Sequence, residues 1–171
     1  PVVTLVGSQL LLTQSIDPRL LERHDEFRFT VLSRFEDAVT GKLIDTVDSN
    51  MAQRLLALIS ALAPIRPDDP RFQELAADFL GIRKPVLVDI TGVLEEQGTL
   101  VRRGYSLRIN PDVLSDHILH KACLTRSGQA TGFADEVFNA FSKIAAERIL
   151  TNLAELDWRL GKTGNTSNLL E

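Results

Sequence analysis

The fold is decided by residues 84–109, which read KPVLVDITGVLEEQG followed directly by TLVRRGYSLRI. In the first part, apolar residues recur at helical spacing after Pro85, and Gly98 stands where a helix C-terminus favours glycine. In the second part the period changes to two, which predicts two short strands joined by a tight turn at Gly104. We therefore expect a helix that leads into a β-hairpin.

Two more helices are predicted before this stretch. One begins at Asp48 and ends before Pro64, because proline cannot continue a helix. The next begins at Asp69, a capping residue that proline follows at the first helical position, and it ends at Gly81. Three helices followed by a hairpin is the order of elements in a winged helix, so the sequence predicts a winged helix over 48–109.

The flanking regions are also predicted to be helical, which makes the expected fold class mainly α. We expect a helical lobe over 1–41, a polar linker over 42–47 that serves as the hinge, and a loose tail over 162–171. Apolar spacing predicts C-terminal helices over 110–161. Such helices are typical of the start of a helical repeat array, although one pair does not establish a repeat.

Composition narrows the class of protein. The 171 residues carry 19 basic against 23 acidic side chains, a formal charge of −4, which argues against a uniformly basic nucleic-acid binder. The single cysteine excludes an intramolecular disulfide and a four-cysteine zinc site. No signal peptide and no apolar run of roughly 18 residues is visible, so we expect a cytoplasmic protein without a membrane partner. Both ends are apolar and uncapped, which predicts a piece of a longer chain.

Few residues suggest a metal-binding or catalytic role. His117, His120 and Cys123 follow one another at three-residue steps on one predicted helix, and three ligands so placed cannot surround a metal ion. We therefore predict half-exposed histidines, a buried cysteine and no metal site. No nucleophile stands beside a candidate base, so we expect no catalytic residue and no enzyme activity in this chain.

The hairpin carries the strongest basic cluster, which consists of Arg102, Arg103 and Arg108. These arginines suit a phosphate backbone, an acidic protein surface or a nucleotide. The helix before them has one lysine against three acidic residues between 84 and 98, which would repel DNA. Sequence-specific binding to duplex DNA is therefore not expected.

Three features in order resemble a known family. They are a proline-opened apolar helix at 1–11, the winged helix, and a strand that runs directly into a capped helix over 107–119. Together they resemble the C-terminal half of the nucleotide-binding module of STAND-class P-loop ATPases, signalling switches whose bacterial members often serve in antiphage defence. The resemblance implies an ATPase core before Pro1, with its Walker motifs, ATP or ADP and Mg, and a trigger-sensing repeat array after the winged helix.

The resemblance also assigns residues. Pro1 matches the proline of the family's Gly-x-Pro motif near the adenine, while Asn110 and Asp112 lie at the place of the Met-His-Asp motif. The histidine of that motif, which contacts the β-phosphate of ADP, is not matched, because Pro111 follows Asn110. Local physics gives another interpretation: Asn110 caps the helix, Pro111 is its first residue and Asp112 complements its dipole.

The sequence therefore predicts a non-catalytic regulatory fragment of a larger STAND-class ATPase, which holds a switch closed and relays a trigger through interdomain contacts. The fragment itself is expected to hold no cofactor. Its expected partners are the rest of its own chain and, in an assembly, further copies of itself. Two alternatives stay open, a winged-helix DNA-binding transcriptional regulator and a helical scaffold for protein–protein interaction.

Overall fold

The computed structural model describes residues 24–41 and 49–162. Pro1, most of the predicted N-terminal lobe, the linker at 42–47 and nearly all of the predicted tail lie outside the described residues. The described part is mainly helical with one short hairpin, as the sequence predicts. Its elements are α2 (His24–Gly41), α3 (Ser49–Leu62), α4 (Pro70–Leu80), α5 (Lys84–Glu96), β1 (Leu100–Arg103), β2 (Ser106–Ile109), α6 (Asp112–Cys123) and α7 (Phe133–Lys162).

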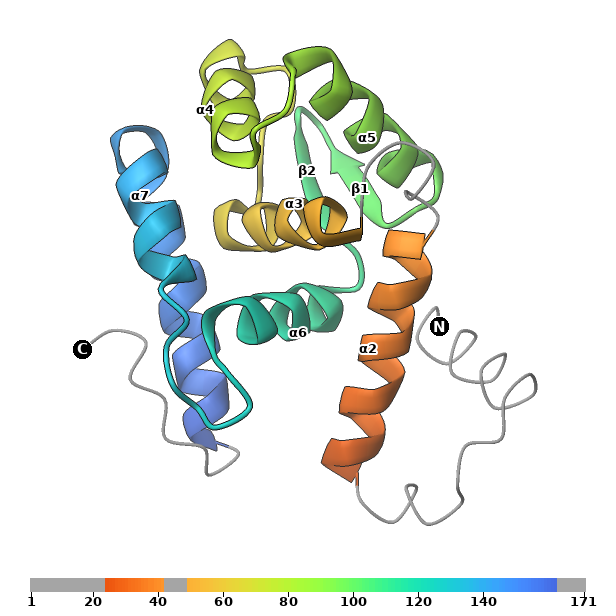
Figure 1. The fold of residues 1–171 in the computed structure, drawn as a ribbon, viewed down its shortest axis with the longest axis vertical. Helices are drawn as coiled ribbons and strands as arrows, with labels where there is room; N and C mark the ends of the chain where they lie inside the picture. Colours follow the sequence, from red (N-terminus) through yellow and green to blue (C-terminus); the bar gives the residue numbers. More distant parts are fainter. Residues whose placement is uncertain (1–23, 42–48, 163–171) are drawn as a thin grey trace.

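Helix α3 lies at the centre of the structure. In Figure 1 it crosses the middle of the molecule, with α4, α5 and the hairpin above it, α6 below it, and α2 and α7 on either side. Leu55 to Leu62 are all buried, so the second half of α3 is covered on every face. A helix that is apolar all round belongs in the interior of a domain. One hydrophobic core accordingly extends from α3 to the hairpin and to α6 and α7.

The hairpin follows the three helices in the predicted order, and residues 49–109 are called here the three-helix–hairpin unit. Strands β1 and β2 pair antiparallel, with Leu100 opposite Ile109. Ile65, between α3 and α4, adds a bridge to Leu107, with N–H···O distances of 2.9 and 2.8 Å. Leu100, Leu107 and Ile109 are each only 1% exposed, so this face of the hairpin closes the core over the helices.

The predicted helix ends are confirmed at three places. Asp69 accepts a hydrogen bond from the N–H of Arg71 and caps α4. Gly98 after α5 has φ +72°, and the N–H groups of Gly98 and Thr99 donate to the carbonyls of Glu95 and Leu94. Gly81 after α4 has φ +67° and the same pair of bonds, the arrangement that terminates a helix with a left-handed residue.

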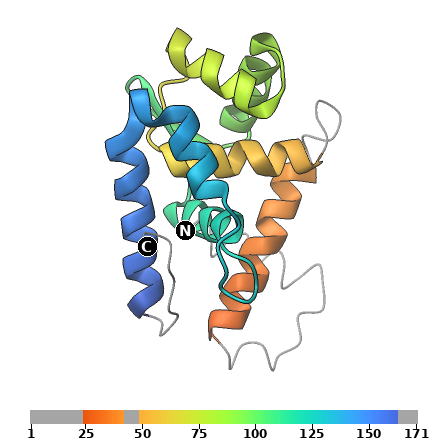
Figure 2. The same cartoon turned by 60° about the vertical axis from the view of Figure 1, so that its left-hand side comes forward.

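Helix α7 consists of two helical segments, which the sequence predicts as separate helices. The backbone leaves the helical region at Ala145, with φ −147° and ψ 19°, and Figure 2 shows the resulting bend. The second segment caps the end of α3, because Asn152 donates to the carbonyls of Ala61 and Ala63 at 2.9 Å each. Arg148 donates to the carbonyl of Pro64 at 2.6 Å. The second segment of α7 is thereby tied to the last turn of the central helix and to the two residues that follow it.

The predicted cap of α6 is wrong. Pro111 occupies the cap position without a side-chain bond, and the helix begins at Asp112 rather than at Pro111. Asn110 instead extends the hairpin, since its N–H donates to the carbonyl of Thr99 at 2.9 Å. Asp112 does lie in the first turn, where a negative charge complements the helix dipole.

Candidate functional site

The three hairpin arginines differ in whether an acidic side chain already pairs with them. Arg102 donates to both carboxylate oxygens of Glu95, at 2.7 and 2.9 Å, and its guanidinium lies 3.4 Å from a carboxylate oxygen of Asp68. These bonds lower the pKa of Glu95. Arg103 is exposed at the tip of the hairpin, next to Tyr105, which is 84% exposed. The guanidinium of Arg102 is thus neutralised within the unit. Of the three hairpin arginines, only Arg103 forms no ion pair with the described residues.

Arg108 points the other way, toward the start of α6. Its Nη1 lies 3.7 Å from Oδ1 of Asp112, the first residue of α6. The structure therefore brings together Arg108, a member of the predicted basic cluster, and Asp112, which the resemblance places near the nucleotide. Asn110 lies between them in sequence but does not line the same pocket.

A pocket of about 220 Å³, here called the junction pocket, lies beside this pair. Arg108 and Asp112 line it together with Asp116 and with Arg159 of α7, which forms ion pairs with Asp116 and Glu155. Ser60 of α3 also lines it, and the buried Ser60 hydroxyl has no hydrogen-bond partner in the part of the chain that the structure describes. The pocket is therefore walled by paired charges of both signs.

A second polar centre is buried between α2 and α6, and no local sequence pattern indicates it. Glu36 of α2 is 2% exposed, and its Oε2 accepts a hydrogen bond from Nζ of Lys121 at 3.1 Å. Nε2 of His117 lies 3.7 Å from the same oxygen. Burial raises the pKa of Glu36, while the hydrogen bond and charge of Lys121 oppose that rise. This centre joins two helices that are 85 positions apart in sequence.

Ser33 completes the group, because its Oγ lies 3.2 Å from Nε2 of His117. A serine, a histidine and a glutamate in a row suggest a hydrolytic triad, in which the carboxylate and the serine bind opposite ring nitrogens. Here both Ser33 and Glu36 approach Nε2, so the ring cannot pass a proton from one to the other. The group links helices and does not form a nucleophile–base relay.

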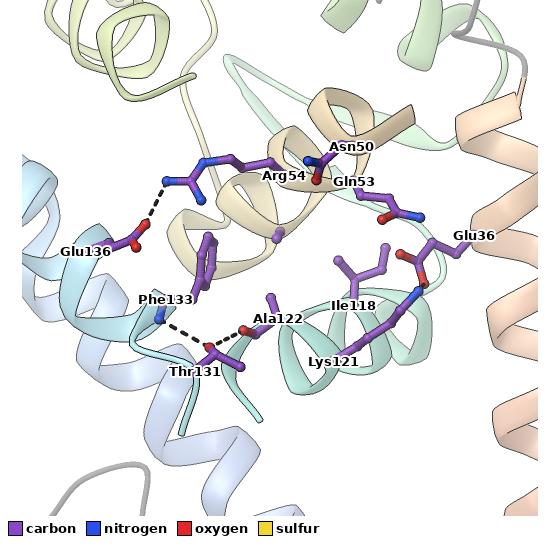
Figure 3. Close-up of a pocket in the computed structure, with 11 residues that line it drawn as sticks. Glu36, Asn50, Gln53, Arg54, Ile118, Lys121, Ala122, Thr131, Phe133 and Glu136 are labelled. Atoms are coloured by element: carbon purple, nitrogen blue, oxygen red, sulfur yellow. Dashed lines mark hydrogen bonds and ion pairs between the residues drawn. The ribbon is translucent and has the colours of Figure 1, made fainter. Parts of the chain in front are cut away.

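A cavity opens next to Glu36 and is called here the interhelix pocket. It has a volume of about 270 Å³ and lies between α3 and α6 (Figure 3). Ala57, Ile118 and Phe133 are apolar residues of its lining, and an ion pair lies at each end (Figure 3). The pairs are Glu36 with Lys121 and, at 2.6 Å, Arg54 with Glu136.

The predicted row of His117, His120 and Cys123 lies along α6. Across residues 24–41 and 49–162, no three His, Cys, Asp or Glu side chains are grouped to hold a metal ion. His117 is buried rather than half-exposed, because its ring lies against α2. Burial lowers the pKa of His120, which is half-buried. Burial raises the pKa of the Cys123 thiol to about 12.

Comparisons with known proteins found no matching family model, no matching curated protein and no matching solved structure. Among the described helices, none combines the length and the apolar character that a bilayer crossing requires.

Proposed function

We propose that this chain is a non-catalytic regulatory module of a larger STAND-class ATPase, and that its three-helix–hairpin unit is a winged helix. The order of elements supports this: three helices, a hairpin, and a strand that leads within two residues into α6. In this proposal the module acts by binding other parts of its own protein, and the ATP chemistry belongs to an upstream core. The gene that encodes the chain should then specify Walker motifs before Pro1.

The observation that carries the proposal is the geometry of the junction pocket. The side chain of Asp112 is 70% exposed and is held only loosely by Arg108 at 3.7 Å. Behind these two charges, Ile109 and Leu114 are buried in the core, so the backbone that presents them is fixed. A fixed backbone with loosely paired charges can exchange its internal partner for one on a neighbouring domain or nucleotide.

A switch of this kind requires only a small free-energy difference. The contacts that hold the closed state have to be worth a few kcal/mol, so that a ligand with different affinity for the two states can reverse the balance. Exposed, paired charges contribute on that scale, each pair giving about 0–1 kcal/mol. The ion pairs of Arg108 and Arg159 at the junction meet this requirement.

DNA recognition is the main alternative, and the charges around α5 argue against it. Arg102 is neutralised by Glu95 of α5 itself, and Asp89 and Glu96 are exposed on the same helix. We expect duplex DNA to bind weakly and to dissociate as salt is raised. A fluorescence-anisotropy titration that gave a sequence-specific Kd of ~10⁻⁸ M or tighter at physiological salt would favour the DNA-binding regulator instead.

The test of the proposal uses the full-length protein. Replacement of Asp112 by alanine should change both nucleotide affinity and self-association, because the junction then loses one of its exchangeable charges. Glu147→Ala is the matched control, since Glu147 is an exposed acidic residue on α7, away from the junction pocket. Equal nucleotide affinity and equal oligomeric state in wild type and Asp112→Ala would contradict the regulatory role of the junction.

A further inference from the structure

The interhelix pocket carries unused hydrogen-bonding groups at both ends. At one end, Oε2 of Glu36 is bound by Lys121, whereas Oε1 has no protein partner among the described residues. Figure 3 shows Oε1 directed toward the interior of the pocket, on the side of Gln53. Since the side chain of Glu36 is only 3% exposed, this oxygen is a buried acceptor with access to the pocket alone. An acceptor so placed favours a ligand with a positively charged donor.

The opposite end carries a donor. Arg54 uses one terminal nitrogen to bind Glu136, at 2.6 Å, and its guanidinium is stacked 4.5 Å above the ring of Phe79. Within the described part of the chain, its Nη1 and Nε donate to no protein acceptor. The stacking fixes the plane of the guanidinium, which prepares the remaining N–H groups to bind a carboxylate. The two ends therefore select opposite charges.

The lining between the ends is partly apolar and partly polar. Ala57, Ile118 and Phe133 are among its apolar residues, and the amides of Asn50 and Gln53 line the pocket without side-chain partners among the described residues. A volume of about 270 Å³ is small beside the ~300–1,000 Å³ of pockets for drug-sized ligands. The occupant that fits is consequently a small molecule, with an apolar or amide-containing middle and a charge at each end.

We propose that the interhelix pocket binds a small elongated zwitterion, with its amino group on Glu36 and its carboxylate on Arg54. A zwitterion adds no net charge to a pocket whose four charged side chains already balance. Two sources share this chemistry, an ω-amino acid and a short peptide with free ends. The site is independent of the function proposed above, since it does not include any residue of the junction pocket.

The test is a titration of the whole 171-residue chain, followed by NMR, with ε-aminocaproate and with a leucine-containing dipeptide as the two zwitterions. Hexylamine and caproate are the matched probes, because each keeps the apolar chain and one of the two charges. We expect saturable shifts with at least one zwitterion, and about tenfold weaker binding of each singly charged probe. The zwitterion that binds more tightly indicates whether the ligand is an ω-amino acid or a short peptide.

Two variants test the two ends of the pocket separately. Arg54→Gln should weaken the zwitterion about tenfold and leave hexylamine unchanged, whereas Glu36→Gln should weaken it about tenfold and leave caproate unchanged. Glu74→Gln, on exposed α4 surface, is the control and should change nothing. A variant that is merely misfolded would lose every probe alike, so the selective pattern is specific to the proposed orientation. Absence of saturable shifts with both zwitterions at about 10 mM, or equal binding of all probes, would overturn the proposal.

Discussion

Lys121 and Glu36 form an ion pair between α6 and α2. We predict that the loss of the lysine lowers the free energy of unfolding much more than the loss of the glutamate charge. Lys121→Met leaves the Glu36 carboxylate buried without its cation. Loss of one partner from a fully buried pair costs about 3–5 kcal/mol, and from an exposed pair about 0–1 kcal/mol. The side chain of Glu36 is 3% exposed and that of Lys121 is 42% exposed. We therefore expect Lys121→Met to lower the free energy of unfolding by ~2 kcal/mol at neutral pH.

Glu36→Gln should behave differently. Burial raises the pKa of Glu36 even though Lys121 opposes the rise, so folding costs more free energy for the ionised carboxyl than for the neutral one. Glutamine has nearly the same shape and no charge to desolvate. The free energy of unfolding of Glu36→Gln at neutral pH should therefore be equal to that of wild type within about 1 kcal/mol, or higher.

The pH dependence follows from the same raised pKa. Between the ordinary value near 4.5 and the raised value, the folded state holds a proton on Glu36 that the unfolded state has released. The stability due to Glu36 is thus complete below pH 4.5 and is lost as the pH rises through the folded-state pKa. The cost of Lys121→Met should shrink as the pH is lowered, because Glu36 then becomes protonated. Urea unfolding at a series of pH values measures this.

Two comparisons sharpen the assay. His117 also faces Glu36, so Lys121→Met is made again in the Glu36→Gln background, where it should cost less than about 1 kcal/mol. Lys143→Met, at an exposed position of α7, is the control for loss of a surface lysine. The reasoning is refuted if Lys121→Met costs nothing at neutral pH, or if its cost grows as the pH falls.

Further predictions concern stability and reactivity. Asp69→Ala should cost about 1 kcal/mol through the lost cap of α4, whereas Asn110→Ala should cost less than half of that, and equal losses in urea unfolding would contradict the assignment of the caps. Phe141→Ala should cost ~3–5 kcal/mol, because Phe141 is 0% exposed and its ring meets that of Phe79 edge-on at 5.7 Å; a loss below about 1 kcal/mol would show that the core is not packed as described. Cys123 should resist Ellman's reagent at pH 8 until the chain unfolds, because a pKa of about 12 leaves only about one thiol in ten thousand ionised. Rapid labelling of the native chain would disprove its burial.

The helices and the hairpin were predictable because their signals are local. The change from a helical period to alternation near Gly98 places the boundary between α5 and β1 correctly. Asp69 and Gly81 mark the two ends of α4 by capping rules that need only neighbouring residues. The two segments of α7 also appear in the apolar spacing, although their shared bend at Ala145 does not.

The polar contacts could not be predicted in the same way, because they join distant parts of the chain. Nothing near Glu36 in the sequence indicates that Lys121 and His117 face it. Arg102 looks like a free cation on a hairpin until the fold places it against Glu95 and Asp68. The sequence shows which residues can carry charge, and only the tertiary structure shows which charges are already satisfied.

The burial of α3 on all sides limits how the molecule can be divided. A fragment that ended at Ile109 would lack α6 and α7, which both pack extensively against α3, and part of the buried surface of α3 would then be exposed. The C-terminal carbonyls of α3 would also lose Asn152. The three-helix–hairpin unit and the C-terminal helices should thus unfold together in a single cooperative transition. In evolutionary terms, the unit could be exchanged between proteins only together with the helices that follow it.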